Sequence, residues 1–191
     1  MRLHRVISTI DAHAAGEPLR IITSGLPVPR GDTVLDRRRW FEEHHDDLRR
    51  LLLFEPRGHA DMYGAILTPP VSPGADHGVI FLTNEGYSTM CGHGIITLTT
   101  ALLETGALQM REPETVVTYD APAGPIVARA SVEGDRVTGV AFANVPSYVI
   151  AADVPVRLAS SEVRVTVAWG GAGYALVEAS DLGVAVDPGN T

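Results

Sequence analysis

Cysteine is almost absent from this chain: Cys91 is the only one in 191 residues. A disulfide within the chain needs two thiols, and structural zinc sites built on two or four cysteines need more than one, so both are excluded. So little cysteine is typical of a reducing compartment, and we expect the protein to be cytoplasmic.

Long apolar runs are missing as well. No stretch reaches the roughly 20 apolar residues of a membrane-spanning helix, and residues 1–5 lack the apolar core of a secretory signal. The sequence therefore predicts no membrane partner. Its hydrophobic content of 45% is nevertheless ample for the buried core of a globular protein.

Positive charge is in deficit. Lysine and arginine number 15 against 23 aspartates and glutamates, and the net charge of −8 argues against nucleic acid as a partner. The basic cluster at 37–39 is followed closely by acidic residues, and we expect all of them on a solvated helix face. His44 and His45 are adjacent and would point apart on a helix, with no third ligand nearby, so the sequence predicts no metal site.

Residues 1–113 have the pattern of an α/β domain. Strands are expected over 5–11 and 19–23, joined by a polar turn, and over 62–67 and 78–83. Between them, residues 36–54 repeat apolar side chains at three- and four-residue spacing, which predicts a helix with Asp36 as its N-cap.

Residues 114–191 differ in texture. Their apolar residues alternate in the manner of half-buried strands, and no helical pattern is convincing; the strands are expected over 115–119, 126–133, 136–142, 162–167 and 174–178. One apolar face of such a sheet needs cover from the first domain, from a partner chain or from residues that the sequence has lost.

Cys91 lies in a glycine-rich turn, residues 90–94. The run 95–104 that follows is apolar nearly all round and is closed by Gly106, which predicts a buried helix. A thiolate is favoured at a helix N-terminus, so we expect a pKa below about 8.5, and the N–H groups of Gly92, His93 and Gly94 can cradle a carboxylate. The alternative is a small buried hydrophobic residue with no chemical role.

Four stretches, in this order, resemble the superfamily of proline racemases, hydroxyproline epimerases and trans-3-hydroxyproline dehydratases. They are residues 11–20 (DAHAAGEPLR), 55–64 (EPRGHADMYG), 86–94 (GYSTMCGHG) and 120–124 (DAPAG). The match extends over nearly the whole chain. Ala14 is a departure, because the family usually has threonine after the histidine.

The resemblance implies an α/β (α+β) fold of the diaminopimelate-epimerase-like kind, a curved, mostly antiparallel sheet around a central helix. Family members have two such halves with the active site between them. The motif that begins their second central helix has no counterpart here, so the second half is expected to be incomplete and the chain to be a truncated member. Residues 1–113 would then be the N-terminal domain with the catalytic turn and central helix, and 114–191 a partial second domain of strands without its central helix.

The resemblance also implies residue roles. Cys91 matches the first catalytic cysteine, a base at the substrate α-carbon, while Gly92 and His93 match substrate-binding positions, beside Gly94 in the same turn. No cofactor is needed, because the step is a proton abstraction. Other polar residues of the matched stretches are expected to support the site: His13, Glu17, Arg57, His59 and Asp61.

The implied substrate is proline or a hydroxyproline. Dehydration of trans-3-hydroxy-L-proline is the favoured interpretation, because it needs one base at the α-carbon and because residues 84–89 look more like the dehydratase branch. Proline racemase and 4-hydroxyproline 2-epimerase are alternatives that need a second acid on the opposite face. A different class of alternative is a catalytically inactive fragment that binds a small amino acid or another subunit. A homodimer in which each copy supplies its Cys91 is the remaining hypothesis.

Overall fold

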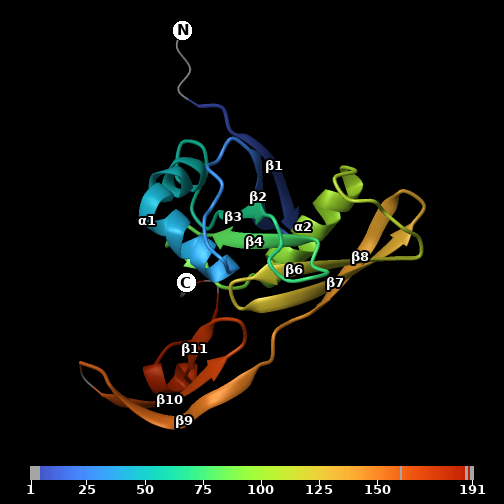
Figure 1. The fold of residues 1–191 in the computed structure, drawn as a ribbon. Coiled ribbons are helices and arrows are strands. Elements are labelled where there is room, and N and C mark those ends of the chain that lie inside the picture. The colour runs from blue at the N-terminus through green and yellow to red at the C-terminus, as the bar shows by residue number, and fades with distance from the viewer. Residues whose placement is uncertain (1–4, 160, 188, 190–191) are drawn as a thin grey trace. The chain divides into compact units, whose positions relative to one another are not determined.

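The structure, a computed structural model, describes residues 5–159, 161–187 and 189. It divides into two compact units, Met1–Asn144 and Val145–Thr191. Figure 1 shows their helices and strands.

The first unit is built on one sheet with the strand order β1-β2-β3-β4-β6-β7-β8, and the short β5 pairs with β4. The pairs β2–β3 and β4–β6 are parallel, and the other pairs of this sheet are antiparallel. A mostly antiparallel sheet is therefore confirmed. Its strands are β1 (Ser8–Ala14), β2 (Glu17–Ser24), β3 (Tyr63–Thr68), β4 (His77–Leu82), β5 (Tyr87–Ser88), β6 (Glu114–Ala121), β7 (Gly124–Glu133) and β8 (Arg136–Ala143).

Helix α2 (Gly92–Glu104) is the central helix of this unit. It packs against β1 and β2 and also against β7 and β8, as Figure 1 allows the reader to follow. Because β1 and β8 are opposite ends of the strand order, one helix contacts both when the sheet curves around it. The helix is apolar over most of its surface, and Ile95, Leu98 and Leu103 are almost completely buried. The curved sheet around a central helix is confirmed.

Helix α1 (Val34–Leu53) packs against β4 and β6. Its N-cap is Thr33, so the prediction of Asp36 was wrong. The Thr33 hydroxyl accepts a hydrogen bond from the Asp36 N–H at 3.1 Å, and the Asp36 carboxylate accepts one from the Thr33 N–H at 3.3 Å. This arrangement is a capping box. Threonine and aspartate are both common N-cap residues, so the sequence alone did not show which of the two occupies the N-cap position.

Of the basic cluster at 37–39, which was predicted on a solvated face of α1, only Arg39 is exposed, whereas Arg37 and Arg38 are half-buried. Arg49, further along the same helix, is buried. This arginine is 6% exposed, and its guanidinium donates hydrogen bonds to the backbone carbonyls of Thr83 and Asn84. Arg49 is spaced i, i+3 from Asp46, as in a surface ion pair. The sequence pattern therefore could not distinguish a buried arginine from an exposed one.

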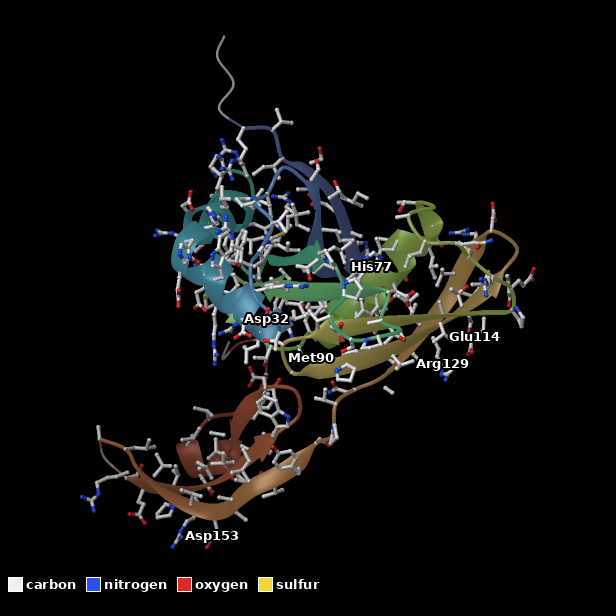
Figure 2. All side chains as sticks on the ribbon, in the orientation of Figure 1. Asp32, His77, Met90, Glu114, Arg129 and Asp153 are labelled. Carbon is white, nitrogen blue, oxygen red and sulfur yellow. The ribbon has the colours of Figure 1, made fainter. Side chains whose placement is uncertain are left out.

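The division between compact units lies after Asn144, whereas the sequence predicted it after residue 113. Strands β6, β7 and β8 continue the sheet of the first unit, because β6 pairs with β4. Glu114 and Arg129, labelled in Figure 2, form an ion pair of 2.9 Å between the neighbouring strands β6 and β7. The change in apolar pattern after residue 113 thus marks where the strands of one sheet become half-exposed, and it is not a boundary between compact units.

The second unit contains a three-stranded antiparallel sheet in the order β11-β10-β9. The strands are β9 (Tyr148–Arg157), which was not predicted, β10 (Glu162–Trp169) and β11 (Gly173–Leu176), and a short 3-10 helix, η1 (Ala179–Leu182), follows. Among the described residues of this unit there is no α-helix. Many of its apolar side chains are exposed, including those of Tyr148, Val149, Ile150, Tyr174, Leu176 and Val184.

Neither of the described helices is both long enough and apolar enough to cross a membrane.

Candidate active site

Cys91 is the N-cap residue of α2, with extended backbone angles (φ −143°, ψ 112°), and the helix begins at Gly92. The Cys91 carbonyl accepts the hydrogen bond of the Ile95 N–H at 3.0 Å, as the first bond of the helix requires. The N–H groups of the first turn have no acceptor within the helix. The predicted placement of the thiol at a helix N-terminus therefore matches the structure. Figure 2 labels Met90, the residue immediately before it.

The glycines beside Cys91 allow close packing. A Cβ atom at Gly94 would lie 2.6 Å from the Phe81 ring and 3.0 Å from the Cys91 sulfur, and one at Gly92 would lie 3.1 Å from the Phe142 ring. Aromatic rings from β4 and β8 thus close over the turn, and any side chain at these positions would displace them. Cys91 is consequently only 6% exposed.

Burial raises the pKa of the Cys91 thiol to about 11, against an ordinary value near 9.0. The Gly94 N–H favours the thiolate and offsets part of this effect, whereas the Glu17 carboxylate opposes ionisation. The prediction of a lowered pKa was therefore wrong. The helix N-terminus does favour the thiolate, but desolvation of the buried sulfur outweighs it.

The His93 ring lies against the thiol. The Cys91 sulfur is 3.6 Å from His93 Nδ1 and 3.7 Å from Nε2, so the sulfur is nearly equidistant from the two nitrogens. The ring of Tyr63 packs edge-on against His93, with centroids 4.6 Å apart and an interplanar angle of 79°. The site therefore draws on β3, β4 and β8 as well as on α2.

Tyr63, Phe81 and Phe142 were not identified from the sequence as site residues. Tyr63 belongs to the matched stretch 55–64, which was a usable signal. Phe81 and Phe142 lie in apolar strand patterns, which do not distinguish a ring packed against the turn at Cys91 from an ordinary core residue.

His13 and Glu17 lie at opposite ends of the turn between β1 and β2. His13 is exposed, and its Nδ1 accepts a hydrogen bond from the Gly16 N–H at 3.1 Å, which is a turn-forming contact. The carboxylate of Glu17 acts electrostatically on the Cys91 thiol, so the structure relates this residue directly to the site.

Arg57, His59 and Asp61 lie exposed in the loop between α1 and β3. The contacts described for them organise that loop. The Arg57 carbonyl accepts a hydrogen bond from Arg20, His59 Nδ1 lies 2.6 Å from the Ala60 carbonyl, and Asp61 has a left-handed φ of 62°. Their support of the site remains a prediction.

No group of three or more His, Cys, Asp or Glu side chains in the described part of the chain is arranged to hold a metal ion.

The sequence of the chain is similar to those of several named enzymes. A family model described as proline racemase matches residues 9–191. A trans-3-hydroxy-L-proline dehydratase of Bacillus cereus is 50% identical over 187 residues, which are 98% of this chain and 56% of the relative. A 3-hydroxyproline 2-epimerase of Burkholderia multivorans is also 50% identical over 187 residues, covering 97% of this chain and 56% of the relative.

A solved structure gives the same result. The hydroxyproline epimerase of Agrobacterium vitis with bound trans-4-hydroxy-L-proline is 35% identical, with a TM-score of 0.91 over 99% of this chain and 56% of its own. The chain thus spans about half the length of the curated relatives it matches. On the family match, the sequence identity and the shared fold, this chain belongs to the proline racemase family.

Proposed function

We propose that this chain carries one wall of an active site that abstracts the α-proton of a proline-type amino acid, with Cys91 as the base. The observation that carries the proposal is the buried thiol at the N-terminus of α2, next to the N–H groups of Gly92, His93 and Gly94. Proton abstraction by a thiolate is an acid–base step and consumes no redox or group-carrying cofactor.

The substrate carboxylate binds at the helix N-terminus in this proposal. The N–H groups of Gly92 and His93 donate to its oxygens while the Gly94 N–H favours the Cys91 thiolate, and the positive end of the helix dipole favours the charge of the carboxylate. A carboxylate held there leaves the α-carbon one bond away and within reach of the Cys91 sulfur. His93 adds a ring that lies 3.6 Å from that sulfur and restricts the approach to it.

The raised pKa fits a base of this kind. A thiolate whose conjugate acid has a pKa of about 11 is a stronger base than the thiolate of free cysteine, and an α-proton is a weak acid. The cost is that little thiolate exists at neutral pH before the substrate binds. The rate is therefore expected to rise with pH throughout the range below about 11.

Dehydration of trans-3-hydroxy-L-proline is the reaction we propose. The Cys91 thiolate takes the α-proton, the electron pair left on the α-carbon forms the double bond to C3, and the 3-hydroxyl takes a proton from the Cys91 thiol or from solvent and leaves as water. The enamine product then tautomerises to the cyclic imine. The 50% identity with the dehydratase of Bacillus cereus supports this choice.

Epimerisation is the alternative, and the 3-hydroxyproline 2-epimerase of Burkholderia multivorans is equally similar. Racemisation or epimerisation shares the first step and then needs a proton donor on the opposite face of the α-carbon. The second wall of the site therefore decides between dehydratase, proline racemase and 4-hydroxyproline 2-epimerase. Product analysis distinguishes them: the proposal predicts the cyclic imine from trans-3-hydroxy-L-proline and none with Cys91→Ser. An epimerised hydroxyproline in its place would contradict dehydration.

We propose in addition that the chain forms a homodimer. The exposed apolar side chains of the second unit, among them Val149, Ile150 and Tyr174, support association. The molar mass in solution tests this, because a monomeric mass at micromolar concentration would contradict it. A non-catalytic role in binding a small amino acid is the candidate that remains if no proton abstraction is found. The cytoplasmic location and the absence of membrane and nucleic-acid partners stay predictions.

A further inference from the structure

Helix α1 contacts the segment that precedes Cys91 through a buried arginine. Arg49 donates from Nη1 to the carbonyls of Thr83 and Asn84, at 2.7 and 2.6 Å. It also forms a two-pronged pair with Asp46, with Nε to Oδ1 at 2.6 Å and Nη2 to Oδ2 at 3.0 Å. One guanidinium thus joins a carboxylate of its own helix to two carbonyls of the loop that follows β4.

A second arginine of α1 contacts the same segment further along. Arg38 donates from Nη1 to the carbonyl of Tyr87 at 2.9 Å. The Arg49 guanidinium lies 5.6 Å from the centroid of the Tyr87 ring, and the Phe41 ring lies 6.5 Å from it. Tyr87 is therefore held at its backbone and at its ring by the same helix.

The far end of the segment is held by the turn between β6 and β7. The Ala123 N–H donates to the Thr89 carbonyl at 3.1 Å. Within the segment, the Thr83 N–H donates to the Gly86 carbonyl at 2.8 Å, and β5 pairs with β4. Residues 83–89 are thus fixed along their length, and Cys91 follows two residues later.

We infer that Arg49 and Arg38 are positioning residues for Cys91, which act by holding residues 83–88 against α1 so that the thiol stays buried beside the N-terminus of α2. The physical reason is that a buried guanidinium must keep its hydrogen-bond acceptors. If the loop moved away, Arg49 would exchange its hydrogen bonds to the carbonyls of Thr83 and Asn84 for bonds to water and would lose its contact with the Tyr87 ring, so the closed loop is favoured. Charge-assisted bonds of this kind are stronger than those between neutral groups.

The inference rests on the proposed role of Cys91 as the base, but its test does not need turnover. Cys91 is the only cysteine of the chain, so the rate of alkylation by iodoacetamide reports on this one thiol. The charged or titratable groups that face it are Glu17 and His93, and neither is changed in the variants below. If the variants alkylate as expected but the wild-type chain shows no α-proton exchange, the proposed function is contradicted and the positioning role of the arginines is not.

The test is the alkylation rate of the folded chain at about pH 8 in wild type and in Arg49→Met, which keeps the apolar stem and removes the donors. We expect a rate increase of at least about threefold, because a released loop lets water reach the sulfur and allows more thiolate to form. An increase below threefold would overturn the inference. Arg39→Met is the matched control, since Arg39 lies on the same helix with its side chain 60% exposed, and its rate should equal that of wild type.

A merely structural role predicts a different outcome, in which the rate follows global stability. Val132→Ala shortens a buried side chain of β7 and supplies a destabilised reference. Val132 pairs with Val137 of β8, whose N–H donates to Glu104 at the C-terminal end of α2, far from Cys91 at the N-terminus of the helix. The two variants are compared when they have the same melting temperature. If Val132→Ala then accelerates alkylation as much as Arg49→Met does, the inference is overturned. If Arg49→Met does not fold, Arg38→Met gives the same test, and an increase below about twofold for that variant would overturn the inference equally.

Discussion

The sulfur of Cys91 lies 3.6 Å from Nδ1 and 3.7 Å from Nε2 of His93, two residues further along the first turn of α2. The imidazole therefore lies against the thiol with its two nitrogens at similar distances, and the ring of Tyr63 packs against the same imidazole with centroids 4.6 Å apart. The His93 ring is therefore one of the groups that limit access to the sulfur.

Removal of the His93 ring should expose the thiol. In His93→Ala we expect Cys91 to react with iodoacetamide at least about threefold faster at pH 8, because the ring no longer shields the sulfur. His77→Ala is the control, since His77 lies at the start of β4 and its rate should stay at the wild-type value. An unchanged rate in His93→Ala would mean that the ring does not limit access to Cys91.

The raised pKa of Cys91 predicts a loss of stability at alkaline pH. The folded-state pKa of about 11 lies above the ordinary value near 9.0, so the neutral thiol is favoured by folding. This contribution is fully present below about pH 9 and is lost as the pH rises through about 11. At roughly 1.4 kcal/mol per unit, it amounts to about 2–3 kcal/mol.

Urea unfolding of wild type and Cys91→Ala at about pH 8 and pH 11.5 measures this contribution. Other groups titrate equally in both proteins, so the difference between the two isolates Cys91. Wild type should lose about 2–3 kcal/mol more than Cys91→Ala across this range. Equal losses would show that burial does not raise the pKa of the thiol.

Gly94→Ala should destabilise the first unit. The added Cβ would lie 2.6 Å from the Phe81 ring and 3.0 Å from the Cys91 sulfur. Overpacking of this kind costs about 1–3 kcal/mol, and the better helix propensity of alanine offsets up to about 1 kcal/mol of it. We expect a net loss of roughly 1–2 kcal/mol in urea unfolding.

The matched control for Gly94→Ala is Gly139→Ala in β8, where a Cβ meets nothing within 4 Å. Its free energy of unfolding should stay within about 0.5 kcal/mol of wild type. If both variants lose the same free energy of unfolding, a clash with the Phe81 ring is not the reason why Gly94→Ala is destabilising.

The hydroxyls of Thr99 and Tyr119 form a buried hydrogen bond of 3.0 Å between α2 and β6. Tyr119→Phe should lower the free energy of unfolding by about 0.5–1.5 kcal/mol. The loss stays small because the Thr99 hydroxyl retains its bond to the Ile95 carbonyl at 2.7 Å. Tyr148→Phe, at a tyrosine that is 58% exposed, should have no effect on stability. An equal effect of both variants would contradict the assigned bond.

The sequence alone was sufficient for the features that depend on local pattern. The apolar run after Cys91 predicted α2, because a helix buried on most sides needs apolar residues at nearly every position. The glycines at 92 and 94 leave room for the rings of Phe142 and Phe81, whereas the carboxylate site predicted for this turn stays a prediction. The strand alternation of β7 was equally clear, with Ile126, Ala128, Ala130 and Val132 all buried.

The features that the sequence did not reveal depend on contacts between distant segments. Arg49 has the spacing of a surface ion pair, and its burial follows from the loop at Thr83 and Asn84, which lies 34 and 35 residues away. The pKa of Cys91 depends on how completely distant strands bury it, which no local pattern reports. The division after Asn144 depends on β6 pairing with β4, a parallel pairing that residue alternation cannot specify.

Exchange of the substrate α-proton with solvent tests the central claim most directly. The chain is incubated in deuterated buffer with trans-3-hydroxy-L-proline, and deuterium at the α-carbon is followed by mass spectrometry, with Cys91→Ser as the paired variant. The proposed role of Cys91 predicts incorporation that rises with pH below about 11 and falls by at least about a hundredfold in Cys91→Ser. Incorporation at the same rate in Cys91→Ser, or none above the protein-free reaction in wild type, would contradict it.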